Sequence, residues 1–418
     1  MERSIIFVIT LSLLTIFATA SFGTTINVGL GGGYTYNTIQ AGINASLSGD
    51  TVIVHDGTYT GTGNSNIDFS GRNITLRSAN GWQNTTIDLQ GSSRAFYFHN
   101  GETRNAVIDG FNVINGVTSS GATAILCNNS SSPTIKNSRF YNNISYDDTK
   151  GGAIGFGSNS DGAIINCIFE KNEARHGGAV SAQNGSDIYV FGCFFLNNHS
   201  RYDGAGLWTH TSTIDVESSV FAYNTGGGGA RFDNGECSVT NSLFYQNSSL
   251  YAGGLRLDTG HLTIKNSTIA DNILSDGYGG GVFLGGYGIL TMLNSIIWGN
   301  DHGSIYLHEW ATVDSITYSD LEGGWLGLGN IDYDPMFLDA LNGNYRISAL
   351  SPAVDAALDI GVYTDLDGNL RPFNVTGVNH GGLFDMGAYE VIPEPSVMLL
   401  IIPGVIAIIM GRKKVRIS

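Results

Sequence analysis

The sequence predicts an all-β protein: a right-handed parallel β-helix solenoid with three strands per rung and a small C-terminal capping module. One phrase recurs seven times between positions 137 and 300, at intervals of 23–29 residues. A repeat this short cannot bury its own apolar side chains, so successive copies must stack on one another. Glycine is abundant (58 residues) and only 13% of residues are charged, which fits turn-rich β structure. The right hand follows from the general bias of parallel crossovers.

The repeated phrase is a small residue, a Phe or Ile two positions later, and an Asn three positions after that. Its seven copies end at Asn143, Asn172, Asn198, Asn224, Asn247, Asn272 and Asn300. Five copies carry phenylalanine, which predicts an inward column of Phe140, Phe169, Phe195, Phe221 and Phe244. We expect this phrase to form the third strand of each rung.

Two further strands complete each rung. The first follows a glycine pair and alternates apolar and polar residues, as a strand with one buried face does. Its predicted inward column is Ile154, Val180, Leu207, Ala230, Leu255, Val282 and Ile305. The second strand buries Ile135, Ile164, Val190, Val216, Val239, Ile264 and Met292. Asn137, Asn166, Asn241, Asn266 and Asn294 stand between the second and third strands, where asparagine tolerates a left-handed turn.

The N-terminal part reads as less regular rungs. Residues 36–43, 49–54 and 56–59 resemble the opening of pectate-lyase-like β-helix proteins, in which a short helix caps the open end and the first strand follows. The repeats also resemble those of polymorphic outer-membrane proteins and other bacterial surface β-helix proteins. The resemblance spans about residues 25–325 and implies the fold. It leaves the function open, because this fold hosts lyases, hydrolases, adhesins and structural proteins.

The pattern changes after Gly324. The motifs at residues 334–337, 343–347, 351–355, 365–372 and 385–390 together resemble the choice-of-anchor Q domain. This resemblance covers residues 330–390 and implies surface display. We expect the module to cover the last rung, which otherwise presents an unpaired edge.

Both ends of the chain resemble targeting segments. Residues 1–20 combine an apolar run with Ala18-Thr19-Ala20, the pattern of a secretory signal peptide. Residues 393–418 contain Pro-Glu-Pro, a short apolar stretch and a basic tail, and resemble a PEP-CTERM sorting signal. That resemblance implies an exosortase-type sorting machinery, contact with the membrane, and a location at the cell envelope, surface or extracellular matrix of a Gram-negative bacterium. A plain tail anchor is the alternative.

The net charge limits the classes of possible partner, and the cysteines bear on the redox state. The net charge of −16 excludes nucleic acid, which such a body repels, and suits an exported protein. Cys167 and Cys193 occupy the same place in adjacent repeats. They are expected either as buried thiols or, after export, as a disulfide.

The outward positions of the first strand carry the candidate functional residues. One column reads Gly155, Ser181, Trp208, Arg231, Arg256, Phe283 and Tyr306, and its neighbour reads Gly157, Gln183, His210, Asp233, Asp258, Gly285 and His308. Asp233 and Asp258 are expected one strand spacing apart, about 5 Å. Such a pair suits a retaining glycosidase or two ligands of Ca²⁺. Trp208, His210, Phe283, Tyr306 and His308 are the candidates for ligand binding.

Three interpretations of this face stay open. A polysaccharide lyase would use Ca²⁺ on Asp233 and Asp258, with Arg231 or Arg256 as the base. A binding groove would stack sugar rings on the aromatic residues. A solvated face would hold Arg and Asp as a mutually neutralising ladder.

A second candidate metal site lies near the C-terminus. Asp365, Asp367 and Asn369 resemble part of a calcium-binding loop, but the full EF-hand pattern is missing and a polar turn is the alternative.

From these observations we predict an exported cell-surface β-helix protein that is structural or adhesive and associated with extracellular polysaccharide. The alternative is a polysaccharide lyase or glycoside hydrolase that acts on an acidic polysaccharide along the first-strand face.

Overall fold

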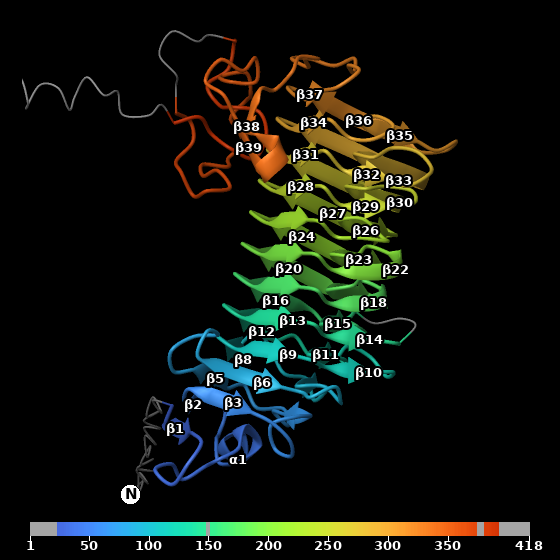
Figure 1. The fold of residues 1–418 in the computed structure, drawn as a ribbon. Coiled ribbons are helices and arrows are strands. Elements are labelled where there is room, and N and C mark those ends of the chain that lie inside the picture. Colours follow the sequence, from blue (N-terminus) through green and yellow to red (C-terminus); the bar gives the residue numbers. More distant parts are fainter. Residues whose placement is uncertain (1–22, 148–150, 374–379, 393–418) are drawn as a thin grey trace, which may run out of the picture.

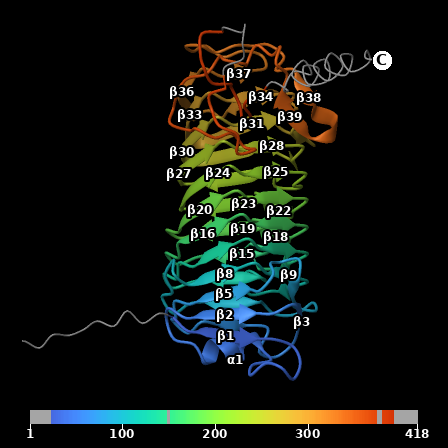
Figure 2. The same cartoon turned by 90° about the vertical axis from the view of Figure 1, so that its left-hand side faces the viewer.

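The computed structural model describes residues 23–147, 151–373 and 380–392, and shows the predicted parallel β-helix (Figures 1 and 2). Within this part of the chain, the first and second strands of the rungs join in one 20-stranded sheet, which we call sheet 1. The third strands form an 11-stranded sheet, which we call sheet 2. All of these strands pair in parallel, so each rung adds one layer to the column.

The strands of sheet 1 fall into two columns. The first column contains β4 (Ile67–Asp68), β7 (Phe96–Phe98), β11 (Ile125–Cys127), β15 (Ile154–Phe156), β19 (Val180–Gln183), β23 (Leu207–His210), β26 (Ala230–Asp233), the first parts of β30 (Leu255–Lys265) and β33 (Val282–Leu293), and β35 (Ile305–Leu307). The second column contains β1 (Thr25–Val28), β2 (Thr51–Val54), β5 (Thr75–Ser78), β8 (Val107–Asp109), β12 (Thr134–Lys136), β16 (Gly162–Ile165), β20 (Asp187–Phe191), β24 (Thr213–Glu217), β27 (Gly235–Thr240), the later parts of β30 and β33, and β36 (Thr312–Thr317).

Sheet 2 holds the repeated phrase. It contains β3 (Gly57–Tyr59), β6 (Thr85–Asp88), β9 (Asn112–Ile114), β13 (Arg139–Tyr141), β17 (Ile168–Glu170), β21 (Phe194–Leu196), β25 (Val220–Ala222), β28 (Leu243–Tyr245), β31 (Thr268–Ala270), β34 (Ile296–Trp298) and β37 (Asp320–Leu321).

The predicted inward columns are confirmed residue by residue. Ile154 pairs with Val180 and Val180 with Leu207, and the same register continues to Ile305. The rings of Phe169 and Phe195 are stacked with centroids 4.9 Å apart, and both side chains are fully buried. Matching side chains therefore line one continuous interior.

The repeated asparagines form a buried ladder. The Nδ2 atom of Asn198 donates to the Asn224 Oδ1 atom at 3.0 Å and to the Phe169 carbonyl at 3.0 Å. The same pattern runs from Asn143 to Asn300. Side-chain amides thus satisfy backbone groups at a turn where the chain leaves sheet 2. The turn asparagines between the second and third strands, such as Asn166 at φ 51°, have the predicted left-handed conformation.

The glycine pairs permit close stacking. A Cβ atom on Gly152 would lie 2.1 Å from the carbonyl oxygen of Gly178 in the next rung. No larger residue fits there without moving the backbone, which explains why a glycine pair opens most repeats.

The sequence analysis did not predict the short fourth strands. They are β10 (Val117–Thr118), β14 (Ile144–Ser145), β18 (Glu173–His176) and β22 (His199–Asp203), with β29 (Ser248–Ser249) and β32 (Ile273–Leu274) pairing higher up. Most are two residues long or polar throughout, so they carry no apolar alternation. These strands position loop side chains beside the outward face of the first column.

Both ends of the column are covered. The helix α1 (Ile39–Asn44) closes the N-terminal end as predicted, with Ile39 and Ile43 buried and the Thr38 hydroxyl accepting from the Ala41 amide at 3.3 Å. At the other end the segment 325–333 lies along the last rung, where the Leu321 amide donates to the Ile331 carbonyl and Trp325 packs against the core.

The C-terminal part continues along sheet 2 and does not extend the column. It contains β38 (Phe337–Asp339), the 3₁₀ helix η1 (Ala340–Asn342) and β39 (Asn344–Ile347), with β38 and β39 antiparallel. Figure 1 shows these elements beside β28 and β31. Tyr345, Ala388 and Tyr389 pack with Leu243 and Ala270 of sheet 2. The segment 325–333 therefore covers the last rung, whereas the rest of the predicted module docks on the side of the column.

All four cysteines are buried thiols. The Cys167 amide donates to the Cys193 sulfur at 3.4 Å, and burial raises the pKa of the Cys167 thiol well above its ordinary value. Cys167 and Cys193 were expected either as buried thiols or as a disulfide, and in the structure they are thiols.

The predicted signal peptide (1–20) and sorting segment (393–418) lie outside the described residues. Within the described ranges, no helix is long and apolar enough to cross a membrane.

Candidate functional site

The first-strand face has the predicted register. Trp208, Arg231 and Arg256 occupy one outward column, which Phe283 and Tyr306 continue. In the neighbouring column His210 pairs with Asp233. Asp258 takes the next place, since Phe232 pairs with Leu257 and Gly235 with Gly260 on either side of it.

The charged residues of this face bind one another in a chain, which we call the charged ladder: His176, Asp203, Arg231, Asp258 and Arg256. Arg231 donates from Nη1 to Asp203 and from Nε to the Asp258 Oδ2 atom, the latter at 2.6 Å. Arg256 donates to the other Asp258 oxygen at 2.9 and 2.8 Å. His176 completes the chain with its Nδ1 atom 2.7 Å from the Asp203 Oδ2 atom.

The ladder leaves its arginines and carboxylates already partnered. The Arg231 side chain is 18% exposed, and burial lowers the pKa of its guanidinium while Asp258 opposes that shift. Asp233 and Asp258 lie on adjacent strands as predicted, but Asp258 is bound by the two arginines and Asp233 by His210. The two carboxylates therefore have separate hydrogen-bond partners, and neither is left without one.

Neighbouring side chains bury part of the predicted ligand-binding set. Trp208 is only 8% exposed because the His176 ring stacks on it with centroids 4.7 Å apart. Phe283 is 7% exposed and lies beside Tyr306, with Arg256 5.3 Å above its ring centroid. Burial and the charge of Arg231 lower the pKa of His176, so its ring is neutral near pH 7. His176 is not among the candidates of the sequence analysis.

Aromatic rings, most of them exposed, gather above the ladder. We call this group the aromatic face; it consists of Tyr251, Tyr278, Tyr287, Tyr306 and Trp310. Tyr278 is 60% exposed and stacks on Tyr306 at 4.8 Å, and Tyr287 is 65% exposed and stacks on Trp310 at 5.6 Å. His308 lies 6.2 Å from the Trp310 ring. Of these residues the sequence analysis named only Tyr306 and His308, because Tyr251 and Tyr278 lie in loops and Tyr287 and Trp310 lie at the corner after the first strand.

His210 and Asp233 form a separate pair at the edge of the ladder. The His210 Nδ1 atom lies 2.8 Å from the Asp233 Oδ2 atom, and the His210 side chain is 45% exposed. A carboxylate that orients an accessible imidazole is an arrangement suited to proton transfer.

The candidate calcium loop is a hydrogen-bonded turn. The Asp365 Oδ1 atom accepts from the amides of Asp367 and Asn369 at 3.0 and 2.7 Å, and its Oδ2 atom accepts from the Glu390 amide at 3.1 Å. Asp367 binds Arg346. These donors occupy the oxygens that a cation needs, so the residues present do not fit a Ca²⁺ site. In the part of the chain that the structure describes, no cluster of three or more His, Cys, Asp and Glu side chains is arranged to hold a metal.

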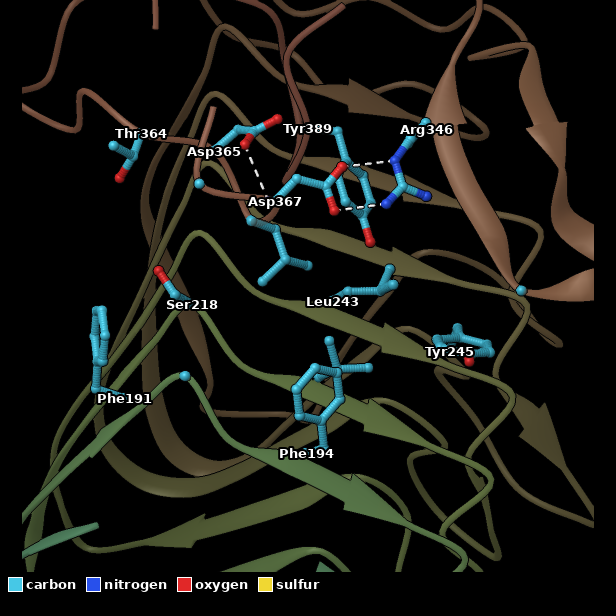
Figure 3. A pocket seen from close by; sticks show the side chains of 15 residues that line it. Phe191, Phe194, Ser218, Leu243, Tyr245, Arg346, Thr364, Asp365, Asp367 and Tyr389 are labelled. Carbon is cyan, nitrogen blue, oxygen red and sulfur yellow. Dashed lines mark hydrogen bonds and ion pairs between the residues drawn. The ribbon is translucent and has the colours of Figure 1, made fainter. Parts of the chain in front are cut away.

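A cleft of about 610 Å³ separates sheet 2 from the C-terminal module, and Figure 3 shows it from close by. Phe194, Val220 and Leu243 line one side, and Arg346, Asp367 and Tyr389 line the other. Sequence reasoning missed this cleft, because its two walls lie more than a hundred residues apart in the chain.

Comparisons with known proteins agree with the fold. A family model described as a right-handed β-helix region matches residues 61–269 and, in an overlapping match, residues 152–319. These matches span more than half of the chain, so the protein belongs to the right-handed β-helix family.

Two solved structures are similar to this chain. Pectate lyase Pel9A aligns with a TM-score of 0.50 at 15% identity, over 89% of this chain and 97% of the lyase. A PL6 alginate lyase in complex with a trisaccharide aligns with a TM-score of 0.35 at 13% identity, over 74% of this chain and 87% of that one. At these identities the likeness concerns the fold alone. No curated protein matches this sequence.

Proposed function

We propose that this protein is an exported cell-surface β-helix protein with a structural or adhesive role, which binds extracellular polysaccharide on its aromatic face. The observation that carries the proposal is a set of stacked rings, of which Tyr278, Tyr287 and Trp310 are solvent-exposed and Tyr306 is half-buried. Large exposed apolar groups on a folded surface mark interaction sites. Tyr278 and Tyr306 come from successive rungs, as do Tyr287 and Trp310, and exposed aromatic rings of this kind can pack against sugar rings.

The charged ladder supports binding over cleavage. Each arginine is neutralised by a carboxylate, and each carboxylate of the ladder is bound by an arginine or histidine. A general base needs a free site within hydrogen-bond reach of the substrate proton. In the ladder these sites are occupied by its own arginines and histidine. The ladder therefore acts as a rigid support beside the aromatic rings.

The binding experiment uses the full chain on a panel of immobilised polysaccharides. Tyr306→Ala and Trp310→Ala should each weaken binding at least about tenfold, the equivalent of 1.4 kcal/mol. Tyr146→Ala is the matched control, because Tyr146 is 56% exposed but lies outside the aromatic face. Equal binding by all three variants would refute the assignment of this face, and release of reducing or unsaturated ends would refute a purely binding role.

Export and sorting form the second part of the proposal. Residues 1–20 act as a signal peptide, residues 330–390 as a choice-of-anchor Q module, and residues 393–418 as a sorting signal processed by an exosortase-type protease at the membrane of a Gram-negative bacterium. The sequence motifs support this assignment. Fractionation of cells that express the full chain, or a form without residues 393–418, tests it. Equal retention of both forms in the envelope would contradict it.

A lyase or hydrolase acting on an acidic polysaccharide is the second candidate function. The accessible His210–Asp233 pair favours it, with Asp258, Arg231 and Arg256 beside the substrate. Incubation with pectate and alginate, with and without Ca²⁺, should then release product from the native protein and none from Asp233→Asn. Absence of product from the native protein under all of these conditions excludes this candidate.

A further inference from the structure

The cleft between sheet 2 and the C-terminal module has no role in the function proposed above. We propose that it is a second binding site, and that its ligand is a short neutral oligosaccharide. The two walls of the cleft differ in chemistry. The charged residues that line it are Arg346, Asp365 and Asp367.

One wall is an apolar column of sheet 2. Phe194, Val220 and Leu243 are outward residues of β21, β25 and β28 that pair in register. Leu243 is covered by Tyr345, Ala388 and Tyr389 of the module, whereas Phe194 is 46% exposed. The module thus stops partway along the apolar column. Figure 3 shows Phe194 and Leu243 on the same side of the cleft, facing the module.

The opposite wall is polar and fixed. The Arg346 guanidinium bonds the Asp367 carboxylate through two N–H groups, at 2.6 and 2.5 Å, and lies 4.7 Å above the Tyr389 ring. Such a bidentate pair is held in one geometry. The Arg346 and Asp367 side chains remain 44% and 32% exposed, so both can still form hydrogen bonds to a ligand.

These walls match a sugar ring better than an apolar or charged molecule. A purely apolar ligand would remove water from the Arg346–Asp367 pair without replacing its hydrogen bonds, which is costly. An anionic ligand would meet Asp365 and Asp367 with a single lining arginine that is already neutralised. A pyranose has an apolar face for Phe194 and hydroxyl groups for the polar wall.

The size of the cleft sets the length of the ligand. Its volume of about 610 Å³ lies within the range of about 300–1,000 Å³ that is usual for ligand sites. That space suits an oligosaccharide of a few units. Because the cleft lies on sheet 2 and the aromatic face on sheet 1, the two sites are separate, and either can fail without the other.

The test titrates the full chain with neutral trisaccharides of glucose, xylose and mannose, followed by calorimetry and by NMR of the ligand. Binding of at least one of them is expected. Phe194→Ala should weaken it at least tenfold, and Arg346→Gln should also weaken it. Tyr306→Ala, on the aromatic face, should leave it unchanged.

A trisaccharide of galacturonate serves as the anionic competitor of the same length and should bind at least tenfold more weakly. The proposal is overturned if no neutral trisaccharide binds at millimolar concentration, if Phe194→Ala binds as well as the native chain, or if the galacturonate trisaccharide binds as tightly. Loss of binding in both Phe194→Ala and Tyr306→Ala would place the ligand elsewhere and would also overturn it.

Discussion

At the scale of single residues, Asp258 holds the first-strand face together. Its two oxygens accept from Arg231 and Arg256, and Arg231 in turn reaches Asp203. All of these side chains are between 13% and 22% exposed. Removal of one partner from a largely buried network leaves the others charged and unpaired, which costs more than loss of an exposed pair.

We therefore expect Asp258→Asn to lower the free energy of unfolding by about 1–3 kcal/mol. Asp233→Asn breaks only the more exposed pair with His210 and should cost less than about 1 kcal/mol. Urea unfolding followed by circular dichroism compares the two variants. A smaller loss for Asp258→Asn than for Asp233→Asn would show that the ladder does not stabilise the fold.

At the scale of elements, the asparagine ladder closes the turn that follows each strand of sheet 2. Asn198 accepts from the backbone amide and the Nδ2 atom of Asn172, both at 3.0 Å, and donates to the carbonyl of Phe169 at 3.0 Å. All of these groups are buried. Each rung thus depends on the side chain of the next rung for its own backbone hydrogen bonds.

Asn198→Ala should destabilise the protein by about 2–4 kcal/mol, because it leaves a buried amide and a buried carbonyl unpaired. Asn44→Ala, at the exposed end of α1, is the control and should cost less than about 0.5 kcal/mol. The urea midpoints of both variants give the comparison. Equal midpoints would mean that the ladder contributes nothing beyond packing.

At the scale of the whole molecule, acidic groups are concentrated at the C-terminal end of the solenoid. Burial raises the pKa of Asp320 to about 7, with the charges of Asp332 and Asp334 adding to the shift. Burial and the charge of Glu390 raise the pKa of Asp385 to about 7. Asp320 belongs to the last rung and Asp385 to the docked module, so each of these two parts contains a carboxyl group with a pKa of about 7.

Stability should therefore depend on pH in a defined direction. A carboxyl whose pKa is higher in the folded than in the unfolded chain binds its proton more tightly when folded, so it favours folding at low pH. The gain is complete below about pH 4 and is lost as the pH rises through 7. We expect the protein to be more stable at pH 5 than at pH 8, by on the order of 2 kcal/mol.

Thermal unfolding between pH 5 and pH 8 measures this dependence. Asp320→Asn should flatten it and raise the stability at pH 8, whereas Asp276→Asn, at an exposed loop position, should leave its slope unchanged. A stability that increases from pH 5 to pH 8 would contradict the assignment.

The sequence predicted the columns of the solenoid because their cause is local and repeated. Phe169 and Phe195 stack because the same phrase recurs at nearly constant spacing, and parallel pairing in register places equal positions one rung apart. The outward register of Trp208, Arg231 and Arg256 followed from the same rule. Which of these side chains reach solvent did not follow from it, since His176 of the short strand β18 covers Trp208.

The sequence by itself thus determined the fold, its core and the order of residues along each face. Only the tertiary structure decided which outward residues are exposed, how the charges pair, and where the cleft lies. Repetition encodes contacts between neighbouring rungs. The cleft instead joins Phe194 to Arg346, a contact between distant segments that depends on where the module docks on sheet 2.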